Sequence, residues 1–249
     1  FVSLDQYTRT SNEKFKKDFC LQALDDYIDG NQNEHNHTIP QSKLKIIKSW
    51  PFIYWISDEF REKFKKNTFE QVAPAKPGLQ TGNNERFLRF WWEIDESNIS
   101  QNYSTDEKKW VFYAKGGSFK KWSGNLWLVL NWENDGHEIK NLIGTNGRLK
   151  SRPQNRQFYF KKGITYTYSG SKGPSFRLLP SNSIFDVSGS SLFGLTFKNT
   201  EYLLGFINSK LAYYILRCLN PTVSTQAGDI NRVPFESPTP HSEQLVSNT

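Results

Sequence analysis

Apolar residues recur at helical spacing at the two ends of the chain, and in the middle they form short runs of strand length. Near the N-terminus this spacing predicts a helix over 13–30 with Asn12 as its N-cap. Ser57 is predicted to cap a second helix over 58–67, because acidic residues fill its first turn and lysines its last, as the helix dipole favours. Near the C-terminus, apolar residues along one face predict a single helix over 199–219.

The middle of the chain is predicted to be a sheet. Residues 73–87 are rich in Pro, Gly and Asn and predict a loop, after which turn-forming residues separate the apolar runs. The predicted strands are 87–93, 110–113, 126–131, 158–161, 163–168, 176–179 and 184–188. A short extended piece is predicted over 229–235.

These patterns predict an α+β fold. We expect a twisted, mostly antiparallel sheet with long loops, flanked by N-terminal helices and a C-terminal helix. The changes of pattern divide the chain into a helical N-terminal segment over 1–72, a sheet domain over 73–235 and a tail over 236–249.

Nothing in the sequence directs the chain to or across a membrane. It begins FVSLDQYTRT, which has neither the cationic n-region nor the apolar h-region of a signal peptide. No apolar run approaches the roughly 18 residues that a membrane helix needs. Two cysteines, Cys20 and Cys218, cannot build a disulfide framework. We therefore expect a cytoplasmic protein without a membrane partner.

The composition contains no methionine, although usage of roughly two per cent would give about five in a chain of this length. We therefore expect the chain to be a fragment of a longer protein. The alternative is that modified methionines are missing from the sequence as written.

Positive charge is concentrated in the middle of the chain. The formal net charge is +7, but residues 76–177 hold 17 Lys and Arg against 9 Asp and Glu, a net of +8. No acidic residue occurs over 139–185, a segment that carries nine Lys and Arg. Because protein surfaces normally mix the two signs, this segregation predicts a polyanionic partner.

Six of the eight tryptophans lie in or beside this basic region. They are Trp91, Trp92, Trp110, Trp122, Trp127 and Trp132. Basic residues interleaved with aromatic rings favour stacking on unpaired bases. Aromatic rings also dominate burial in small sheets, so we expect about two thirds or more of these six rings in the core.

Catalytic motifs are scarce. No Walker loop, no Gly-x-Gly-x-x-Gly, no Cys/His set with zinc spacing and no Pro-Pro dipeptide occurs. The sequence therefore offers no metal-binding or catalytic residues and is typical of a binding module, and whether the chain is an enzyme stays open. One alternative is a metal-dependent nuclease that uses Asp135, Glu138 and Lys140. Against it, Asn134-Asp135-Gly136 is typical of a turn between a strand and a short helix or another strand.

A series of sequence blocks follows in order along the middle and the end of the chain. The blocks are GLQTGNNERFLRFWWE (78–93), KWVFY (109–113), KGGSFKKW (115–122), NWENDG (131–136), RLKSRP (148–153) with Asn155, KGITY (162–166), IFD (184–186) with GSS (189–191), LGFINSK (204–210), NPT (220–222) and GDI (228–230). Together they resemble the large adenine-specific DNA methyltransferases of BREX phage-defence systems (PglX-like) and their type IIG restriction–modification relatives. The resemblance covers about residues 70–235.

The resemblance implies that residues 73–235 are a DNA target-recognition domain. Such a domain binds duplex DNA beside the catalytic methyltransferase domain of the same parent chain, which methylates a site-specific adenine. S-adenosylmethionine is then expected as the cofactor of the parent, and none in this chain. The alternatives that remain are the nuclease and a protein-interaction module whose basic face meets acidic partners.

Candidate DNA-binding residues follow from side-chain chemistry. Arginines read guanine edges with two hydrogen bonds and lysines neutralise phosphates, whereas Asn and Gln pair with adenine. The candidates are Arg148, Lys150, Arg152, Arg156, Lys161, Lys162, Lys172, Lys115, Lys120, Lys121, Gln80, Asn83 and Asn84.

Overall fold

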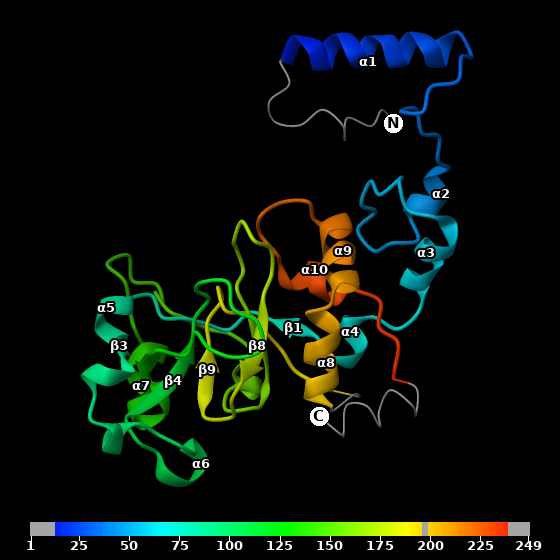
Figure 1. Ribbon diagram of the computed structural model, residues 1–249. Helices are drawn as coiled ribbons and strands as arrows, with labels where there is room; N and C mark the ends of the chain where they lie inside the picture. Colours follow the sequence, from blue (N-terminus) through cyan, green and yellow to red (C-terminus); the bar gives the residue numbers. More distant parts are fainter. Residues whose placement is uncertain (1–12, 196–198, 239–249) are drawn as a thin grey trace. The chain divides into compact units, whose positions relative to one another are not determined.

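The structure is a computed structural model that describes residues 13–195 and 199–238 (Figure 1). The chain forms two compact units, Phe1–Lys65 and Lys66–Thr249. In the part described, no helix combines the length and the apolar character that crossing a membrane requires.

The first unit is built from helices. They are α1 (Glu13–Ile28), α2 (Gln41–Leu44) and α3 (Asp58–Glu62), and α3 continues into the 3-10 turn Lys63–Lys65. Both helices predicted from the sequence are present. The chain leaves α1 through Gly30 with φ +73°, and the Ser57 side chain accepts a hydrogen bond from the Phe60 amide at 3.1 Å, as an N-cap should. The predicted cap Asn12 lies outside the described residues.

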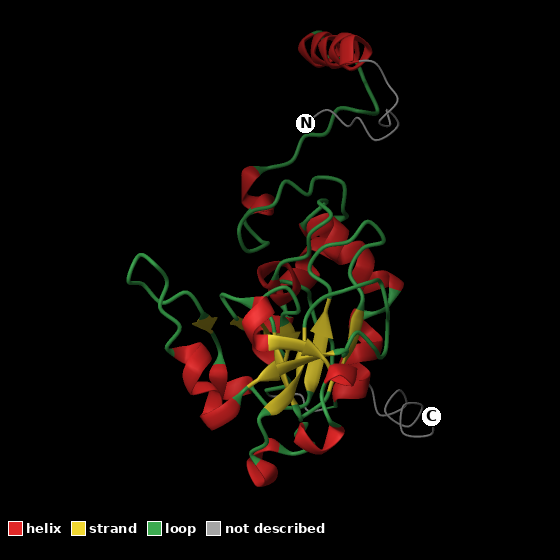
Figure 2. Cartoon of the chain, turned by 90° about the vertical axis from the view of Figure 1, so that its left-hand side faces the viewer, coloured by secondary structure: helices red, strands yellow, loops and turns green. Residues whose placement is uncertain are grey.

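The second unit contains two four-stranded sheets and one strand pair, with the strands in the centre and the helices around them (Figure 2). The first sheet has the order β1 (Ala75–Lys76), β10 (Ser191–Leu192), β7 (Gly163–Tyr166) and β8 (Phe176–Leu179). The second has the order β3 (Leu88–Phe90), β5 (Leu128–Asn131), β4 (Trp110–Ala114) and β9 (Ser183–Phe185). The pair is β2 (Leu79–Gln80) with β6 (Arg152–Pro153).

Every strand pair in these sheets is antiparallel except β4 with β9. The helices of the unit are α4 (Phe69–Val72), α5 (Asn84–Phe87), α6 (Tyr103–Asp106), α7 (Glu133–Lys140), α8 (Thr200–Ile207), α9 (Lys210–Leu219) and α10 (Ala227–Asn231). The predicted α+β class, mostly antiparallel with helices at both ends of the chain, is confirmed.

Four predicted elements were wrong. The loop predicted over 73–87 contains β1, β2 and α5, each too short to show a periodic pattern in the sequence. Residues 158–161 form no strand, because the chain passes from a 3-10 turn (Arg156–Phe158) to Phe160 at φ +58° and buries Tyr159 from a turn. The single helix over 199–219 is two helices: α8 ends at its C-cap Asn208, and Ser209 caps α9 by accepting from the Ala212 amide. The extended piece over 229–235 begins within α10.

The tryptophan prediction was also wrong. Among the six, Trp132 is buried and Trp110 and Trp127 are partly buried. Trp91, Trp92 and Trp122 are 48%, 58% and 54% exposed. The strands are short, so the chain turns away from the sheet before these exposed rings reach its core; β3, for example, ends at Phe90 and Trp91–Glu93 form a 3-10 turn.

Candidate nucleic-acid interface

The acid-free segment 139–185 does not form one continuous surface element. It runs from α7 through an exposed hairpin into β6, then through β7 and β8 to β9. Its cations therefore fall on several elements, and only some of them approach the polar loop that precedes α5.

The closest approach is between β2 and β6. Gln80 pairs with Arg152 in the antiparallel register, and both residues are exposed. Immediately beyond β2 the chain turns at Gly82, where φ is +74° and a Cβ would lie 2.7 Å from the carbonyl carbon and oxygen of Lys150. The loop that holds Gln80, Asn83 and Asn84 thus contacts the backbone of the Lys150–Arg152 segment.

A buried hydrogen-bond group fixes β2 in place. The Tyr113 hydroxyl lies 2.6 Å from the Leu79 carbonyl oxygen and 2.5 Å from Asp186 Oδ2. Burial raises the pKa of Tyr113, and the Asp186 carboxylate raises it further, so the phenol stays protonated. Asn155 Nδ2 adds a hydrogen bond of 2.8 Å to the Pro77 carbonyl oxygen. Gln80 and Arg152 are therefore presented from a rigid support.

The two asparagines of the loop also have local structural roles. The Asn83 side chain caps α5 by accepting from the Arg86 amide at 3.1 Å, and Asn84 Oδ1 accepts from Thr81 Oγ1 at 2.6 Å. Each side-chain oxygen is thus engaged within the loop. Their amide nitrogens are the groups that could donate to a base, and the predicted pairing with adenine stays a prediction.

An exposed hairpin over 143–149 adds positive charge beside this loop. Ile143 forms an antiparallel bridge with Leu149, and the Gly144 amide donates to the Arg148 carbonyl oxygen at 2.8 Å. Arg148 and Lys150 are both exposed at its second arm. Figure 1 shows the hairpin as the green loop near α5. We call Gln80, Asn83, Asn84, Arg148, Lys150 and Arg152 the β2–β6 cluster.

Four other predicted cations make contacts elsewhere on the unit. Arg156 Nη2 lies 3.7 Å from Asp135 Oδ2, and Lys162 Nζ lies 2.6 Å from Glu201 Oε1. Lys121 Nζ donates to the Asn208 carbonyl oxygen at 2.8 Å, and Lys161 Nζ lies 5.8 Å from the centre of the Phe158 ring. The two exposed ion pairs hold their side chains weakly. Lys121 and Lys161 make a hydrogen bond and a ring contact instead, and all four residues stay predictions as DNA contacts.

Lys115 and Lys120 lie apart from the β2–β6 cluster, in the segment that follows β4. Lys115 lines a cavity of about 390 Å³ together with Gly116, Gly117 and Trp127. Lys120 Nζ lies 5.3 Å from the centre of the Trp127 ring. Lys172 is exposed in a turn closed by the Gly173 amide on the Gly170 carbonyl oxygen. The sequence had singled out the lysines, but not the cavity, because its other walls come from strands far apart in the chain.

The residues of the nuclease alternative are occupied by ion pairs. Lys140 Nζ lies 2.6 Å from Asp135 Oδ2, and Glu138 pairs with Arg86. The predicted turn is present within α7, where Asn134, Asp135 and Gly136 all have left-handed backbone angles. Within residues 13–195 and 199–238, no group of three or more His, Cys, Asp or Glu residues is arranged to hold a metal ion.

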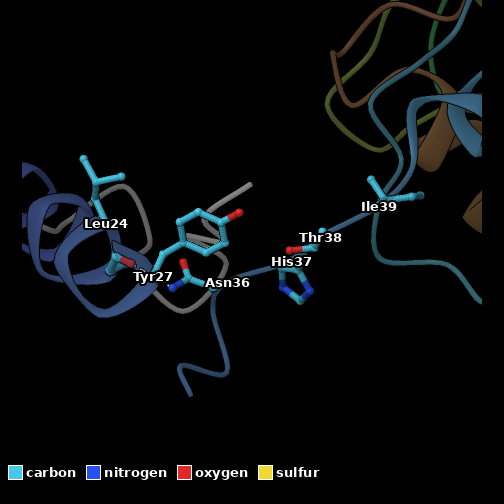
Figure 3. A pocket seen from close by; sticks show the side chains of 7 residues that line it. Leu24, Tyr27, Asn36, His37, Thr38 and Ile39 are labelled. Carbon is cyan, nitrogen blue, oxygen red and sulfur yellow. Dashed lines mark hydrogen bonds between the residues drawn. The ribbon is translucent and has the colours of Figure 1, made fainter. Parts of the chain in front are cut away.

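The first unit has an open cavity of its own, also about 390 Å³, shown in Figure 3. Ala23, Leu24 and Tyr27 of α1 line it together with residues 36–39. The Tyr27 and Leu24 side chains extend from the helix, whereas His37 and Thr38 lie on the extended segment. This lining contains no Lys or Arg, so the cavity offers no complement to a polyanion.

No protein-family model matches the chain. The adenine-specific methyltransferase PglX of Lacticaseibacillus casei (strain Zhang) is 32% identical over 216 residues, which are 84% of this chain and 18% of that protein. The adenine-specific methyltransferase BrxX of Escherichia coli O9:H4 (strain HS) is 30% identical over 229 residues, which are 90% of this chain and 17% of that protein. The chain spans less than a fifth of the length of these curated relatives, and it is homologous to a region of the PglX and BrxX adenine-specific methyltransferases.

Proposed function

We propose that this chain is a DNA target-recognition region of an adenine-specific methyltransferase of a phage-defence or restriction–modification system. It binds duplex DNA through the β2–β6 cluster. The observation that carries the proposal is the contact between the Gln80–Asn84 loop and the Lys150–Arg152 segment, within a chain homologous to part of two adenine-specific methyltransferases.

The chemistry of the β2–β6 cluster suits a duplex. Arg148, Lys150 and Arg152 supply cations for phosphates, and a guanidinium also reads guanine with two hydrogen bonds. Gln80 lies opposite Arg152, so an amide and a guanidinium are offered side by side, each on a strand that packs against the core. The set combines sequence-independent attraction with groups that discriminate between bases.

In this proposal, another part of the parent protein carries out methyl transfer. Its catalytic domain is the proposed partner within the same chain, and S-adenosylmethionine is its proposed cofactor. This chain orients the duplex so that the target adenine reaches that domain. The assembly acts on bacterial DNA in the cytoplasm.

A salt titration tests DNA binding. Anisotropy with a labelled duplex of mixed sequence gives the affinity of the 249-residue chain at several salt concentrations. The logarithm of the affinity should fall linearly with that of the salt concentration, with a slope of about −0.9 per phosphate contacted. Arg152→Ala should weaken binding by about fivefold or more at fixed salt, since an ionic contact at the centre of the cluster is lost.

Arg217→Ala is the matched control. Arg217 is also an exposed arginine of the second unit, but it lies on α9, outside the basic block, and donates to the Thr222 carbonyl oxygen. Its removal should leave the affinity within about twofold of the wild type. Affinity that does not respond to salt, or equal effects of the two substitutions, would contradict the proposal.

A further inference from the structure

The cavity beside β4 has features that DNA backbone binding at the β2–β6 cluster does not use. It lies where β4 ends and β5 begins and is closed by the chain that follows β7 and β9. Its lining is Lys115, Gly116, Gly117, Trp127, Leu128, Thr167, Tyr168, Ser169 and Ser188. A volume of about 390 Å³ lies within the range of roughly 300–1,000 Å³ typical of small-molecule sites.

One side of the lining offers hydrogen-bond donors. The Gly116 and Gly117 amides donate to no group among the described residues. Gly117 has φ +129°, and a Cβ on Gly116 would approach the Ser188 carbonyl oxygen to 3.0 Å, so glycine suits both positions. With the Lys115 ammonium next to them, these two amides form a place where an anion would be well solvated.

Behind the same wall lies a buried positive charge. Arg177 is 1% exposed, forms no ion pair within the described residues, and its Nε has no hydrogen-bond partner. Its Nη1 donates to Thr167 Oγ1 at 3.0 Å, and Thr167 lines the cavity. Nη1 also donates to the Lys120 and Ser175 carbonyl oxygens. Burial lowers the pKa of Arg177 to about 10, as expected for a buried cation that has no carboxylate beside it.

The hydrogen bond from Arg177 orients the Thr167 hydroxyl, which lines the cavity. Because its oxygen accepts from Arg177, its own proton is directed to another acceptor, and none is found in the part of the chain that the structure describes. No acidic residue lines the cavity. Both oxygens of the Asp186 carboxylate are engaged, one accepting from Tyr113 and the other from the amide and hydroxyl of Ser188.

The remaining lining is aromatic and apolar. Trp127, Leu128 and Tyr168 contribute it, and Lys120 stands over the Trp127 ring at 5.3 Å from its centre. A planar base has two flat faces that stack on such rings, and this stacking tolerates any base. The cavity thus combines donors for a phosphate with a platform for a base.

We propose that this cavity binds a single nucleotide with its base unpaired, the phosphate at Lys115, Lys120 and the Gly116–Gly117 amides and the base at Trp127 and Tyr168. The nucleotide belongs either to a DNA strand, with its base out of the stack, or to a free mononucleotide. Only the first source rests on the function proposed above.

The indole N–H signals of the 249-residue chain provide the test. Deoxyadenosine monophosphate is titrated into the labelled protein, and the Trp127 signal is assigned through its loss in Trp127→Phe. That signal should shift saturably, with half-saturation below about 10 mM, while the signal of exposed Trp92 stays in place. Inorganic phosphate, which lacks the base, should bind at least about fivefold more weakly.

Lys120→Ala and Lys161→Ala form a matched pair, because each removes an exposed lysine that stands over an aromatic ring. Lys120→Ala should weaken nucleotide binding by about fivefold or more and Lys161→Ala by less than about twofold. The indole signals of the other tryptophans report whether each variant is folded. A short single strand that binds more tightly than the mononucleotide identifies DNA as the source, and the reverse order identifies a free nucleotide.

The inference is overturned if the Trp127 signal does not shift saturably, if phosphate alone binds as tightly as the nucleotide, or if the two lysine variants behave alike. Salt-dependent duplex binding without a nucleotide response would leave the proposed function standing and remove this site. A nucleotide response without duplex binding would do the opposite.

Discussion

At the scale of single residues, two glycines show how the interface depends on backbone contacts. Gly82 and Gly147 have nearly the same backbone angle, φ +74° and +73°. A Cβ on Gly147 would meet nothing within 4 Å, whereas one on Gly82 would lie 2.7 Å from the Lys150 carbonyl group. Alanine substitutions at these two glycines therefore distinguish the strain of a left-handed residue from the additional cost of a steric clash.

We expect Gly147→Ala to lower the free energy of unfolding by about 1 kcal/mol, the cost of a left-handed L-residue. Gly82→Ala should lower it by about 2 kcal/mol or more, because the backbone of Lys150 must move. Urea unfolding of both variants measures the difference. Equal losses would mean that the two segments separate without cost, and the β2–β6 cluster would then lack a rigid support.

At the scale of elements, the break between α8 and α9 is made by a contact that no local pattern contains. Asn208 is buried, and its amide group bonds to both backbone groups of Phe176, accepting from the N–H at 3.2 Å and donating to the carbonyl oxygen at 3.0 Å. Phe176 belongs to β8, an edge strand of its sheet. Trp122 pairs with the same edge, donating to the Phe176 carbonyl oxygen and accepting from the Leu178 amide, and Asn208 supplies the acceptor for the Phe176 N–H.

Asn208→Ala should destabilise the fold by about 2–3 kcal/mol, because it leaves a buried N–H without an acceptor. Ser209→Ala removes only a helix cap and should cost about 1 kcal/mol. Thermal unfolding of both variants decides between these expectations. A cost for Asn208→Ala no larger than that for Ser209→Ala would show that water replaces the amide as the acceptor for the Phe176 N–H.

Several elements were predictable because their signals are local. Ser57 as a cap and strands β4, β5 and β8 follow from residues that are neighbours in sequence. The break at Asn208 was not predictable, since the apolar residues of α8 and α9 continue the same helical period and the deciding partner lies 32 residues away. Residues 158–161 misled in the opposite way. Their aromatic run is typical of a strand, but Tyr159 is buried from a turn and, among the described residues, the segment makes only one backbone hydrogen bond to β9, from the Phe160 amide to Ser183.

At the scale of the whole molecule, the basic block of residues 76–177 lies within the second unit, Lys66–Thr249. We expect residues 66–249 alone to unfold cooperatively and to bind duplex DNA with the salt dependence of the full chain. Calorimetry and the salt titration check this. A chain of 66–249 that does not unfold cooperatively, or that loses DNA affinity by more than about tenfold, would show that the first unit takes part.

The sequence predicted which residues could contact DNA, but not which of them lie together in the structure. Charge and side-chain chemistry singled out thirteen residues, ten of them Lys or Arg, and the structure brings six of the thirteen together as the β2–β6 cluster. The others are separated by the sheet topology, which sequence proximity does not reveal. Lys161 and Lys162, for example, are adjacent in sequence to β7, yet Lys162 pairs with Glu201 of α8.

The pairing of β1 with β10 has a consequence for how this protein is made. Ala75 pairs with Leu192, so the first strand of the second unit finds its neighbour more than a hundred residues later. Strand pairs so far apart in sequence form slowly, because closing a long loop loses chain entropy before the stabilising contacts are made. During synthesis, β1 therefore cannot pair until β10 has been translated and has left the exit tunnel of the ribosome. The four-stranded sheet of β1, β10, β7 and β8 is thus completed only after Leu192 has emerged.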